Sequence, residues 1–214
     1  MQFQLLIVLI CCVFAYLVGS INFAILISRT FYGKDVRNYG SNNAGMTNVL
    51  RTFGKIPAIV TFVGDFVKGI VSVLICNILF FSFLKTESPI YASGLIGICA
   101  LLGHVFPIFC RFKGGKGVSV SAGVLLAVDW TVFLFVVLIF AFVFCISKIV
   151  SLSSIISALM YPIFTLIKCL IVGESLIDSV IRVFFAFSIS SIIVFMHRTN
   201  IKRLLNGNEP KIKM

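Results

Sequence analysis

Charged side chains are scarce in this 214-residue chain, where aspartate, glutamate, lysine and arginine together make up 12% of the residues. A soluble globular domain carries about 25%. Hydrophobic residues make up 60%, and the mean hydropathy is +1.14. A water-soluble core of this size has no room for so much apolar surface. The composition therefore predicts a protein that lies in a lipid bilayer.

Acidic residues are the rarer charge type, with 7 Asp and Glu against 18 Lys and Arg and a formal net charge of +11. In a soluble protein this excess would suggest nucleic acid as a partner. In a membrane protein the position of each basic residue in the loops decides its meaning. We therefore expect the lipid bilayer, and no nucleic acid, as the partner of the basic surface.

Residues for metal or thiol chemistry are also missing from the expected inner loops. The seven cysteines fall in apolar runs, at positions 11, 12, 76, 99, 110, 145 and 169. The inner loops contain no paired carboxylates and no His, Asp and Glu set with metal-ligand spacing. We expect no metal, no cofactor and no thiol nucleophile.

Long apolar runs are what the sequence does contain. A spanning helix needs about 20 apolar residues, and such runs lie near residues 3–28, 56–84, 90–110, 118–147, 150–172 and 176–196. Basic residues cluster in the first loop, in the third loop and in the tail, and the positive-inside rule places all three on the cytoplasmic side.

Counted as they stand, the apolar runs place three spans between the third loop and the tail. An odd number of spans would put one of these two basic regions on the outer side of the membrane. Splitting the long fourth run at Asp129-Trp130, into 118–128 and 131–147, removes the conflict. The sequence therefore predicts an all-α integral membrane protein with seven transmembrane helices, an outer N-terminus and a cytoplasmic C-terminus. We expect residues 1–214 to form a single membrane domain.

The first inner loop is rich in small polar residues and glycine. It reads Tyr-Gly-Ser-Asn-Asn-Ala-Gly-Met-Thr-Asn over residues 39–48 and is followed by Arg51. Such a loop lets backbone N–H groups converge on an anion, and an arginine adds a bidentate clamp. A simple polar turn is the alternative interpretation.

The third loop combines glycines and lysines directly before an apolar helix, a pattern typical of phosphate binding. Its central residues are Lys113, Gly114, Gly115, Lys116 and Gly117. The loop is not a Walker A motif, which needs Gly at position 110 and Ser or Thr at position 117. A basic anchor for anionic lipid head groups is the alternative.

The tail begins with His197-Arg198-Thr199-Asn200, a basic stretch that by itself suggests a membrane anchor. Three basic stretches rich in hydrogen-bonding groups on one membrane face instead favour a pocket for two anionic groups.

Charges inside the apolar runs favour local pairing. Asp65 and Lys68 lie three residues apart on one helical face and are expected to form a structural ion pair. Asp178 and Arg182 have i,i+4 spacing, and Lys168 is expected to extend toward the membrane surface. His104 is either a packed hydrogen-bonding residue or a catalytic group.

Several of these stretches, in this order, resemble one family along nearly the whole chain. They are residues 19–21, 40–48 with Arg51, 65–69, 103–107, 112–118, 151–152, and 197–198 with 200–201. The family is the bacterial acyl-phosphate–glycerol-3-phosphate acyltransferases, PlsY. The resemblance implies seven helices, three inner motifs and a reaction that yields lysophosphatidate and inorganic phosphate without a metal or a thioester donor.

The resemblance also implies roles for individual residues. The catalytic set is Ser41, Arg51, His197 and Asn200. The substrate-binding set is Asn43, Thr47, Asn48, Lys113, Gly114, Gly115, Lys116, Gly117, Ser151 and Ser154. Glu209 is assigned a structural role, in addition to the structural Asp65–Lys68 pair described above. The chain departs from the family pattern at Asn22, Asn42, Met46 and Val120, and Asn42 is expected to tolerate a positive φ.

Acyl-phosphate is an activated mixed anhydride, so positioning and electrostatics are expected to supply most of the catalysis. We expect Arg51, Lys113, Lys116 and the backbone of residues 114–117 to hold the phosphates, and a substrate phosphate oxygen to accept the proton. The expected partners are both substrates and the soluble enzyme that makes acyl-phosphate, at a bacterial cytoplasmic (inner) membrane with the site facing the cytoplasm. The rival functions are a small anion or organophosphate transporter, which would need functional charges near the bilayer midplane, and a lipid-binding scaffold.

Overall fold

A computed structural model of the chain describes residues 2–85 and 89–212, and within these ranges all regular elements are helices. The predicted all-α class is confirmed. The helices separate into two compact units, one that ends at Val128 and one that begins at Asp129. The two units are described separately, and the expectation of a single membrane domain stays a prediction.

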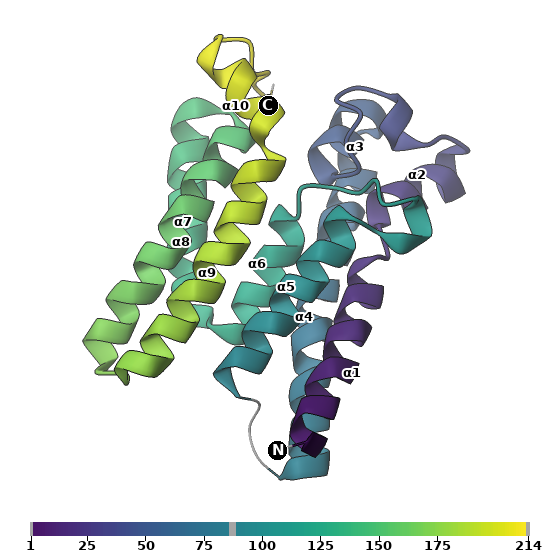
Figure 1. Ribbon diagram of the computed structural model, residues 1–214. Helices are drawn as coiled ribbons and strands as arrows, with labels where there is room; N and C mark the ends of the chain where they lie inside the picture. Colours follow the sequence, from purple (N-terminus) through teal and green to yellow (C-terminus); the bar gives the residue numbers. More distant parts are fainter. Residues whose placement is uncertain (1, 86–88, 213–214) are drawn as a thin grey trace. The chain divides into compact units, whose positions relative to one another are not determined.

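The first unit is built around α4, which packs against α1, α5 and α6. Its elements are α1 (Gln2–Gly19), α2 (Phe23–Tyr32), the 3₁₀ helix η1 (Val36–Asn38), α3 (Met46–Phe53), α4 (Lys55–Leu84), α5 (Ile90–Val105), the 3₁₀ helix η2 (Ile108–Cys110) and α6 (Val118–Val128). The short elements α2, η1 and α3 lie together at one end of this unit, beside the segment that joins α5 to α6 (Figure 1). This end holds both glycine-rich loops.

The second unit is an antiparallel arrangement in which α8 packs against both α7 and α9. Its elements are α7 (Trp130–Ser147), α8 (Val150–Val172), α9 (Leu176–Met196) and α10 (Arg198–Leu205). The break before α7 falls where the sequence predicts it. Asp129 ends the preceding helix and caps α7 by accepting a hydrogen bond from the Val132 amide at 3.1 Å.

Six helical segments among the described residues are long and apolar enough to cross a membrane. They are Gln2–Tyr32, Lys55–Leu84, Ile90–Cys110, Trp130–Ser147, Val150–Val172 and Leu176–Met196. The remaining apolar helix, α6, has 11 residues and is shorter than a full span. The count of seven spans and their orientation therefore stay predictions.

The first apolar run, predicted as one helix over 3–28, is interrupted in the structure. Helix α1 ends at Gly19, and α2 begins at Phe23 after its N-cap Asn22, whose Oδ1 accepts from the Ile25 amide at 3.0 Å. A break within an apolar segment exposes backbone groups that lipid is unable to satisfy. Lys68 resolves this problem by donating a hydrogen bond of 2.6 Å to the Ile21 carbonyl.

The helix predicted over 90–110 is also shorter than expected, since α5 ends at Val105. Pro107 disfavours the α conformation at Phe106, and the chain turns there into η2. This early end frees residues 106–117 to form a long loop above the helix ends. That loop contains the predicted phosphate-binding stretch.

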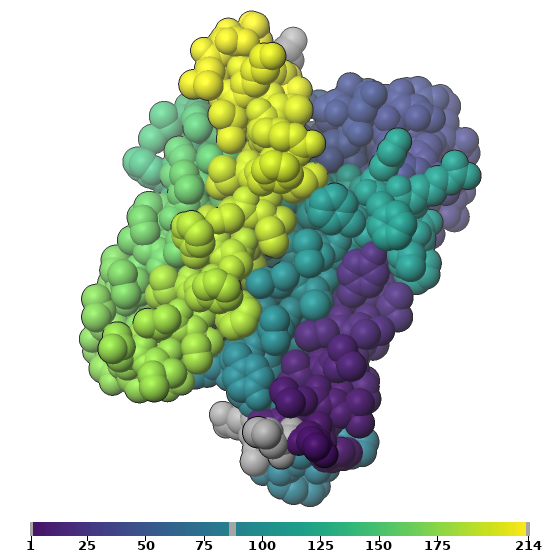
Figure 2. Space-filling model, viewed as in Figure 1, coloured from purple at the N-terminus to yellow at the C-terminus, as the bar shows by residue number. Residues whose placement is uncertain are grey.

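Glycines let the helices of the first unit approach closely. A Cβ at Gly69 would lie 2.3 Å from the Val120 carbonyl oxygen, and one at Gly123 would lie 2.0 Å from the Phe66 oxygen. A Cβ at Gly103 would meet the Tyr16 oxygen at 2.2 Å. Small residues at interfaces are how helices associate in lipid. In Figure 2 the side chains of α1 and α5 accordingly form one continuous surface.

Candidate active site

The loop between α2 and α3 (residues 33–45, loop one) is organised by the buried side chain of Asn48. Its Nδ2 donates to the carbonyls of Val36, Tyr39 and Asn43 at 2.9–3.0 Å, and its Oδ1 accepts from the Ser41 amide at 2.8 Å. These four bonds all lie within loop one and the turn that starts α3. Asn48, which the resemblance assigned to substrate binding, therefore shapes the loop that presents the other residues.

The turn at the tip of loop one has two residues with left-handed backbone, Gly40 and Asn42, both at φ 57°. The expectation that Asn42 tolerates a positive φ is confirmed. Ser41 is exposed at this tip, and Arg51 is exposed on α3, the helix that follows. Asn43 and Thr47 are partly buried between them. Loop one and α3 together thus offer hydroxyl, amide and guanidinium groups.

The segment between α5 and α6 (residues 106–117, loop three) folds back onto the end of α5. The Gly114 amide donates to the Val105 carbonyl at 3.1 Å, and the Gly115 amide donates to the His104 carbonyl at 3.2 Å. These two N–H groups are already donated to protein carbonyls. The phosphate binding predicted for the backbone of residues 114–117 therefore does not involve the amides of Gly114 and Gly115, because both amides hold the loop in place.

Gly115 lies where loop three meets loop one. A Cβ at this position would lie 2.2 Å from His104 Nε2 and 2.6 Å from the Ala44 carbonyl oxygen. Because even the smallest side chain collides there, glycine is required for packing. Lys113 is exposed and Lys116 is partly buried beside this contact. Loop one and loop three therefore form one continuous site within the first unit.

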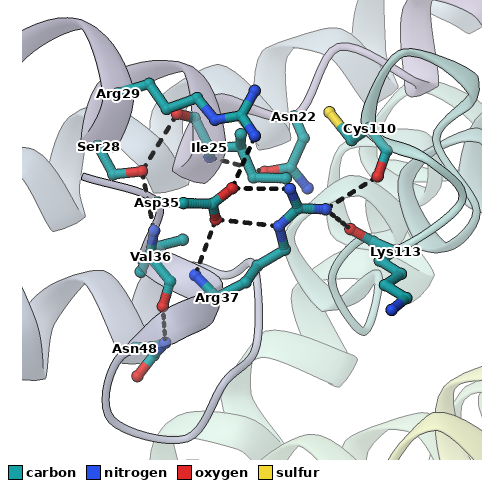
Figure 3. Close-up of polar contacts among 10 residues, drawn as sticks. All are labelled: Asn22, Ile25, Ser28, Arg29, Asp35, Val36, Arg37, Asn48, Cys110 and Lys113. Atoms are coloured by element: carbon teal, nitrogen blue, oxygen red, sulfur yellow. Dashed lines mark hydrogen bonds and ion pairs between the residues drawn. The ribbon is translucent and has the colours of Figure 1, made fainter. Parts of the chain in front are cut away.

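A guanidinium joins the same two loops a second time. Arg37 donates from NH1 to the carbonyls of Cys110 and Lys113, at 2.9 and 3.0 Å (Figure 3). Its other side binds the Asp35 carboxylate in a bidentate pair of 3.0 and 2.7 Å, and Arg29 binds the same carboxylate at 2.8 Å. The Arg37 hydrogen bonds, helped by Arg29, hold the pKa of the Asp35 carboxyl well below its ordinary value against the effect of burial. The carboxylate therefore stays ionised and keeps Arg37 in place.

The predicted ion pair within the second apolar run is confirmed and belongs to a larger buried cluster. Lys68 Nζ lies 2.7 Å from Asp65 Oδ1 and 3.0 Å from His104 Nδ1, and these side chains are at most 4% exposed. The same Nζ holds the Ile21 carbonyl. His104 is therefore a packed hydrogen-bonding residue, and the cluster connects the break between α1 and α2 to the base of loop three.

In the second unit, Glu209 gathers the start of α8 and the tail around one carboxylate. It accepts from Ser151 Oγ at 2.7 Å, from Asn200 Nδ2 at 2.5 Å and from Arg203 Nε at 2.6 Å. Burial acts to raise the pKa of the Glu209 carboxyl, but the hydrogen bonds from Arg203, Asn200 and Ser151 together lower it below its ordinary value. The implied structural role of Glu209 fits this geometry.

The other predicted residues of the second unit lie close to this cluster in the chain. Ser154, one turn along α8 from Ser151, donates to the Val150 carbonyl at 2.9 Å. His197 lies between α9 and α10, and its Nδ1 lies 2.8 Å from the Ile193 carbonyl oxygen. Both are buried. A carbonyl acceptor at Nδ1 favours the tautomer of His197 that carries its proton on Nδ1.

One expected ion pair in the second unit, Asp178 with Arg182, is wrong. Arg182 pairs with Glu174 at 2.7 Å, whereas Asp178 accepts from Ser175 Oγ, because Ser175 caps α9 and takes up the nearby carboxylate. The side chain of Lys168 is 40% exposed, and its extension toward the membrane surface stays a prediction. It binds Asp129 at 2.6 Å and so ties α8 to the start of α7.

Taken together, these features define a class of protein: an integral membrane protein with several spans and with cationic, glycine-bearing loops gathered at one end of its first unit. The sequence matches the profile of the family described as glycerol-3-phosphate acyltransferase over residues 9–207. The chain belongs to this family.

Similar proteins agree with this assignment. A glycerol-3-phosphate acyltransferase of Staphylococcus haemolyticus (strain JCSC1435) is 40% identical over 213 residues, which cover 94% of this chain and 96% of the relative. One of Clostridioides difficile (strain 630) is 39% identical, with 95% of each chain covered. The crystal structure of PlsY (YgiH), described as an integral membrane glycerol 3-phosphate acyltransferase in its glycerol 3-phosphate form, has a TM-score of 0.82 and 37% identity and covers 96% of both chains.

Proposed function

We propose that this protein transfers an acyl chain from acyl-phosphate to glycerol 3-phosphate and releases lysophosphatidate and inorganic phosphate. The observation that carries the proposal is the double junction of loops one and three, through Gly115 and through Arg37. This junction brings loop one, which contains Ser41, next to loop three, which contains Lys113 and Lys116, and Arg51 follows loop one on α3. Such a set of donors suits two phosphate-bearing substrates.

The chemistry needs little beyond positioning, because acyl-phosphate is already activated. The glycerol hydroxyl oxygen attacks the acyl carbonyl carbon, the bond from that carbon to the phosphate oxygen breaks, and inorganic phosphate leaves. A phosphate oxygen of a substrate takes the hydroxyl proton. Arg51, Lys113 and Lys116 hold the phosphates and stabilise the charge that develops in the transition state.

In the second unit, the family resemblance assigns the orientation of phosphates to His197 and Asn200. It assigns hydroxyl contacts to Ser151 and Ser154, at the start of α8. Glu209 holds Ser151 and Asn200 in one place by hydrogen bonds of 2.7 and 2.5 Å. The PlsY structures described as the glycerol 3-phosphate form and the lysophosphatidic acid form support glycerol 3-phosphate as substrate and lysophosphatidate as product.

Transport of an organophosphate without catalysis is the rival function. A transporter would place functional charges near the bilayer midplane. The buried charges Asp65 and Lys68 instead contact each other, His104 and the Ile21 carbonyl. This closed cluster favours a structural role for the charges, and hence the enzyme.

The donor is tested with purified protein in detergent and labelled glycerol 3-phosphate. Acyl-phosphate is expected to give labelled lysophosphatidate and inorganic phosphate in equal amounts, whereas acyl-CoA gives none. Arg51→Ala serves as the control for a contaminating activity, because removing a charge-assisted phosphate contact costs about 1.5–3 kcal/mol, or at least tenfold in rate. Product formed from acyl-CoA alone, or an Arg51→Ala variant with unchanged activity, would refute the proposed reaction.

We also propose that the site faces the cytoplasm of a bacterial cell, at the cytoplasmic membrane, where a soluble enzyme supplies acyl-phosphate. The support is the basic excess in loop one, loop three and the tail. Single cysteines introduced at Lys34, Arg111 and Lys211 of a cysteine-free variant are expected to react with an impermeant maleimide only from the inner side. A cysteine at Asp178 should react only from the outer side. Labelling of any of the first three together with position 178 contradicts this topology.

A further inference from the structure

Loop three contains a backbone conformation that its own residues disfavour. Arg111 and Phe112 are consecutive non-glycine residues in the left-handed region, at φ 56° and 57°. Each pays a steric penalty between its Cβ and the following carbonyl oxygen. Neither side chain is buried, so side-chain packing does not compensate for this penalty. The surrounding structure must hold the turn.

Arg37 contacts the backbone on both sides of this turn. Its NH1 group donates to the carbonyl of Cys110, directly before the two left-handed residues, and to the carbonyl of Lys113, directly after them. The Lys113 amide donates to the Cys110 carbonyl at 3.4 Å and the Phe112 amide to the Pro107 carbonyl at 3.0 Å. A guanidinium that binds both the Cys110 and the Lys113 carbonyl fixes their separation and so reinforces this turn. The residue that follows the turn, Lys113, is thereby placed at the start of the glycine stretch.

Arg37 is itself held in place. The Asp35 carboxylate takes its Nε and NH2 donors, and the Asp35 side chain also accepts from the Arg37 amide at 3.0 Å. The guanidinium has five N–H groups, and the contacts to Asp35, Cys110 and Lys113 use four of them. Its charge is also balanced by the carboxylate. These donors serve the protein.

We propose that Arg37, oriented by Asp35, is a positioning residue that locks loop three in the conformation in which Lys113 and Lys116 hold a phosphate. The part that concerns phosphate rests on the proposed function. The lock itself does not, since loop three should be held even in the absence of any substrate. The two parts therefore need separate measurements.

Arg29 provides a matched control. It binds the same Asp35 oxygen as Arg37 and carries the same charge, but its side chain is 57% exposed and its described contacts do not include loop three. Arg37→Gln and Arg29→Gln therefore remove the same charge near the same carboxylate. Arg37→Lys keeps the charge and loses the fork that spans two carbonyls.

The lock is measured by amide hydrogen exchange of residues 106–117 in detergent without substrate. Loss of the Arg37 hydrogen bonds is expected to speed exchange there by about tenfold or more in both Arg37 variants. Arg29→Gln should change it less than about twofold. Adding Phe112→Gly to Arg37→Lys should restore part of the protection, because glycine adopts the left-handed conformation without the penalty.

Unchanged exchange of residues 106–117 in Arg37→Lys overturns the proposal. Faster exchange throughout α1 and α9 as well also overturns it, since Arg37 would then stabilise the whole fold. The phosphate part is read from kinetics: the KM for acyl-phosphate or for glycerol 3-phosphate should rise about tenfold in Arg37→Lys with a smaller change in kcat. A protein without acyl transfer, but with the expected exchange pattern, refutes the proposed function and leaves the lock intact.

Discussion

Alanine at position 115 is expected to lower the rate of acyl transfer by about a hundredfold, because a displacement of about 1 Å at a reacting centre has an effect of this size. The new methyl group would lie 2.2 Å from His104 Nε2 and 2.6 Å from the Ala44 carbonyl oxygen. His104 is buried and its Nδ1 contacts Lys68 at 3.0 Å, which opposes a movement of the ring. Loops one and three must separate instead, which moves Lys116 away from the groups of loop one.

The measurement is kcat and KM of purified Gly115→Ala with both substrates. Gly173→Ala is the matched control. Gly173 ends α8 with φ 70°, and a Cβ there would have no neighbour within 4 Å, so this variant carries backbone strain without a collision. It should keep near-normal kinetics. Near-normal kinetics in Gly115→Ala would mean that the contact between the two loops does not position the substrates.

Hydrophobicity and charge in the sequence predicted the helical class and the break at Asp129 for a clear physical reason. An aspartate in the middle of an apolar run needs polar partners, and a helix end supplies them: the Asp129 carboxylate caps the next helix. No charged residue in the sequence marks the helix break after Gly19. Every residue from 13 to 28 is uncharged, and the lysine that satisfies the broken backbone lies 47 positions away, at Lys68.

The residues of the candidate site also differ in whether the sequence alone indicates their roles. Exposed residues with anion-binding chemistry, such as Arg51 and Lys113, are recognisable from local composition because the roles proposed for them depend on their own side chains. In the sequence, Asn48 and Gly115 look like further anion-binding residues. In the structure their contacts instead build loops one and three. Their roles depend on contacts to carbonyl groups, and composition does not show which carbonyl a chain fold brings near.

Arg37 is the residue that sequence reasoning missed most clearly. It counted only as one of several basic residues that mark the inner side of the membrane. Asp35, two positions earlier, was a usable signal, since an acidic residue in a basic loop has reason to pair. The contacts of Arg37 to Cys110 and Lys113 span more than 70 positions in the sequence and are visible only in the three-dimensional structure.

Replacing Lys68 with methionine is expected to destabilise the protein by about 3–5 kcal/mol, because it leaves a buried carboxylate without its cationic partner. Asp65 is 2% exposed and would retain only His104, at 3.5 Å, among its described ionisable neighbours. The change also removes the donor to the Ile21 carbonyl, at the break between α1 and α2. Both effects act on the end of the first unit that holds loops one and three.

Unfolding in mixed micelles of a mild detergent and dodecyl sulfate measures this loss. Lys85→Met is the matched control, since Lys85 lies at the exposed end of the same helix and its loss should change stability by no more than about 1 kcal/mol. The double variant Asp65→Leu with Lys68→Met should be more stable than Lys68→Met alone, because it leaves no buried charge unpaired. Equal stability of the single and double variants would show instead that the Ile21 contact, rather than the ion pair, explains why a lysine stands at this position.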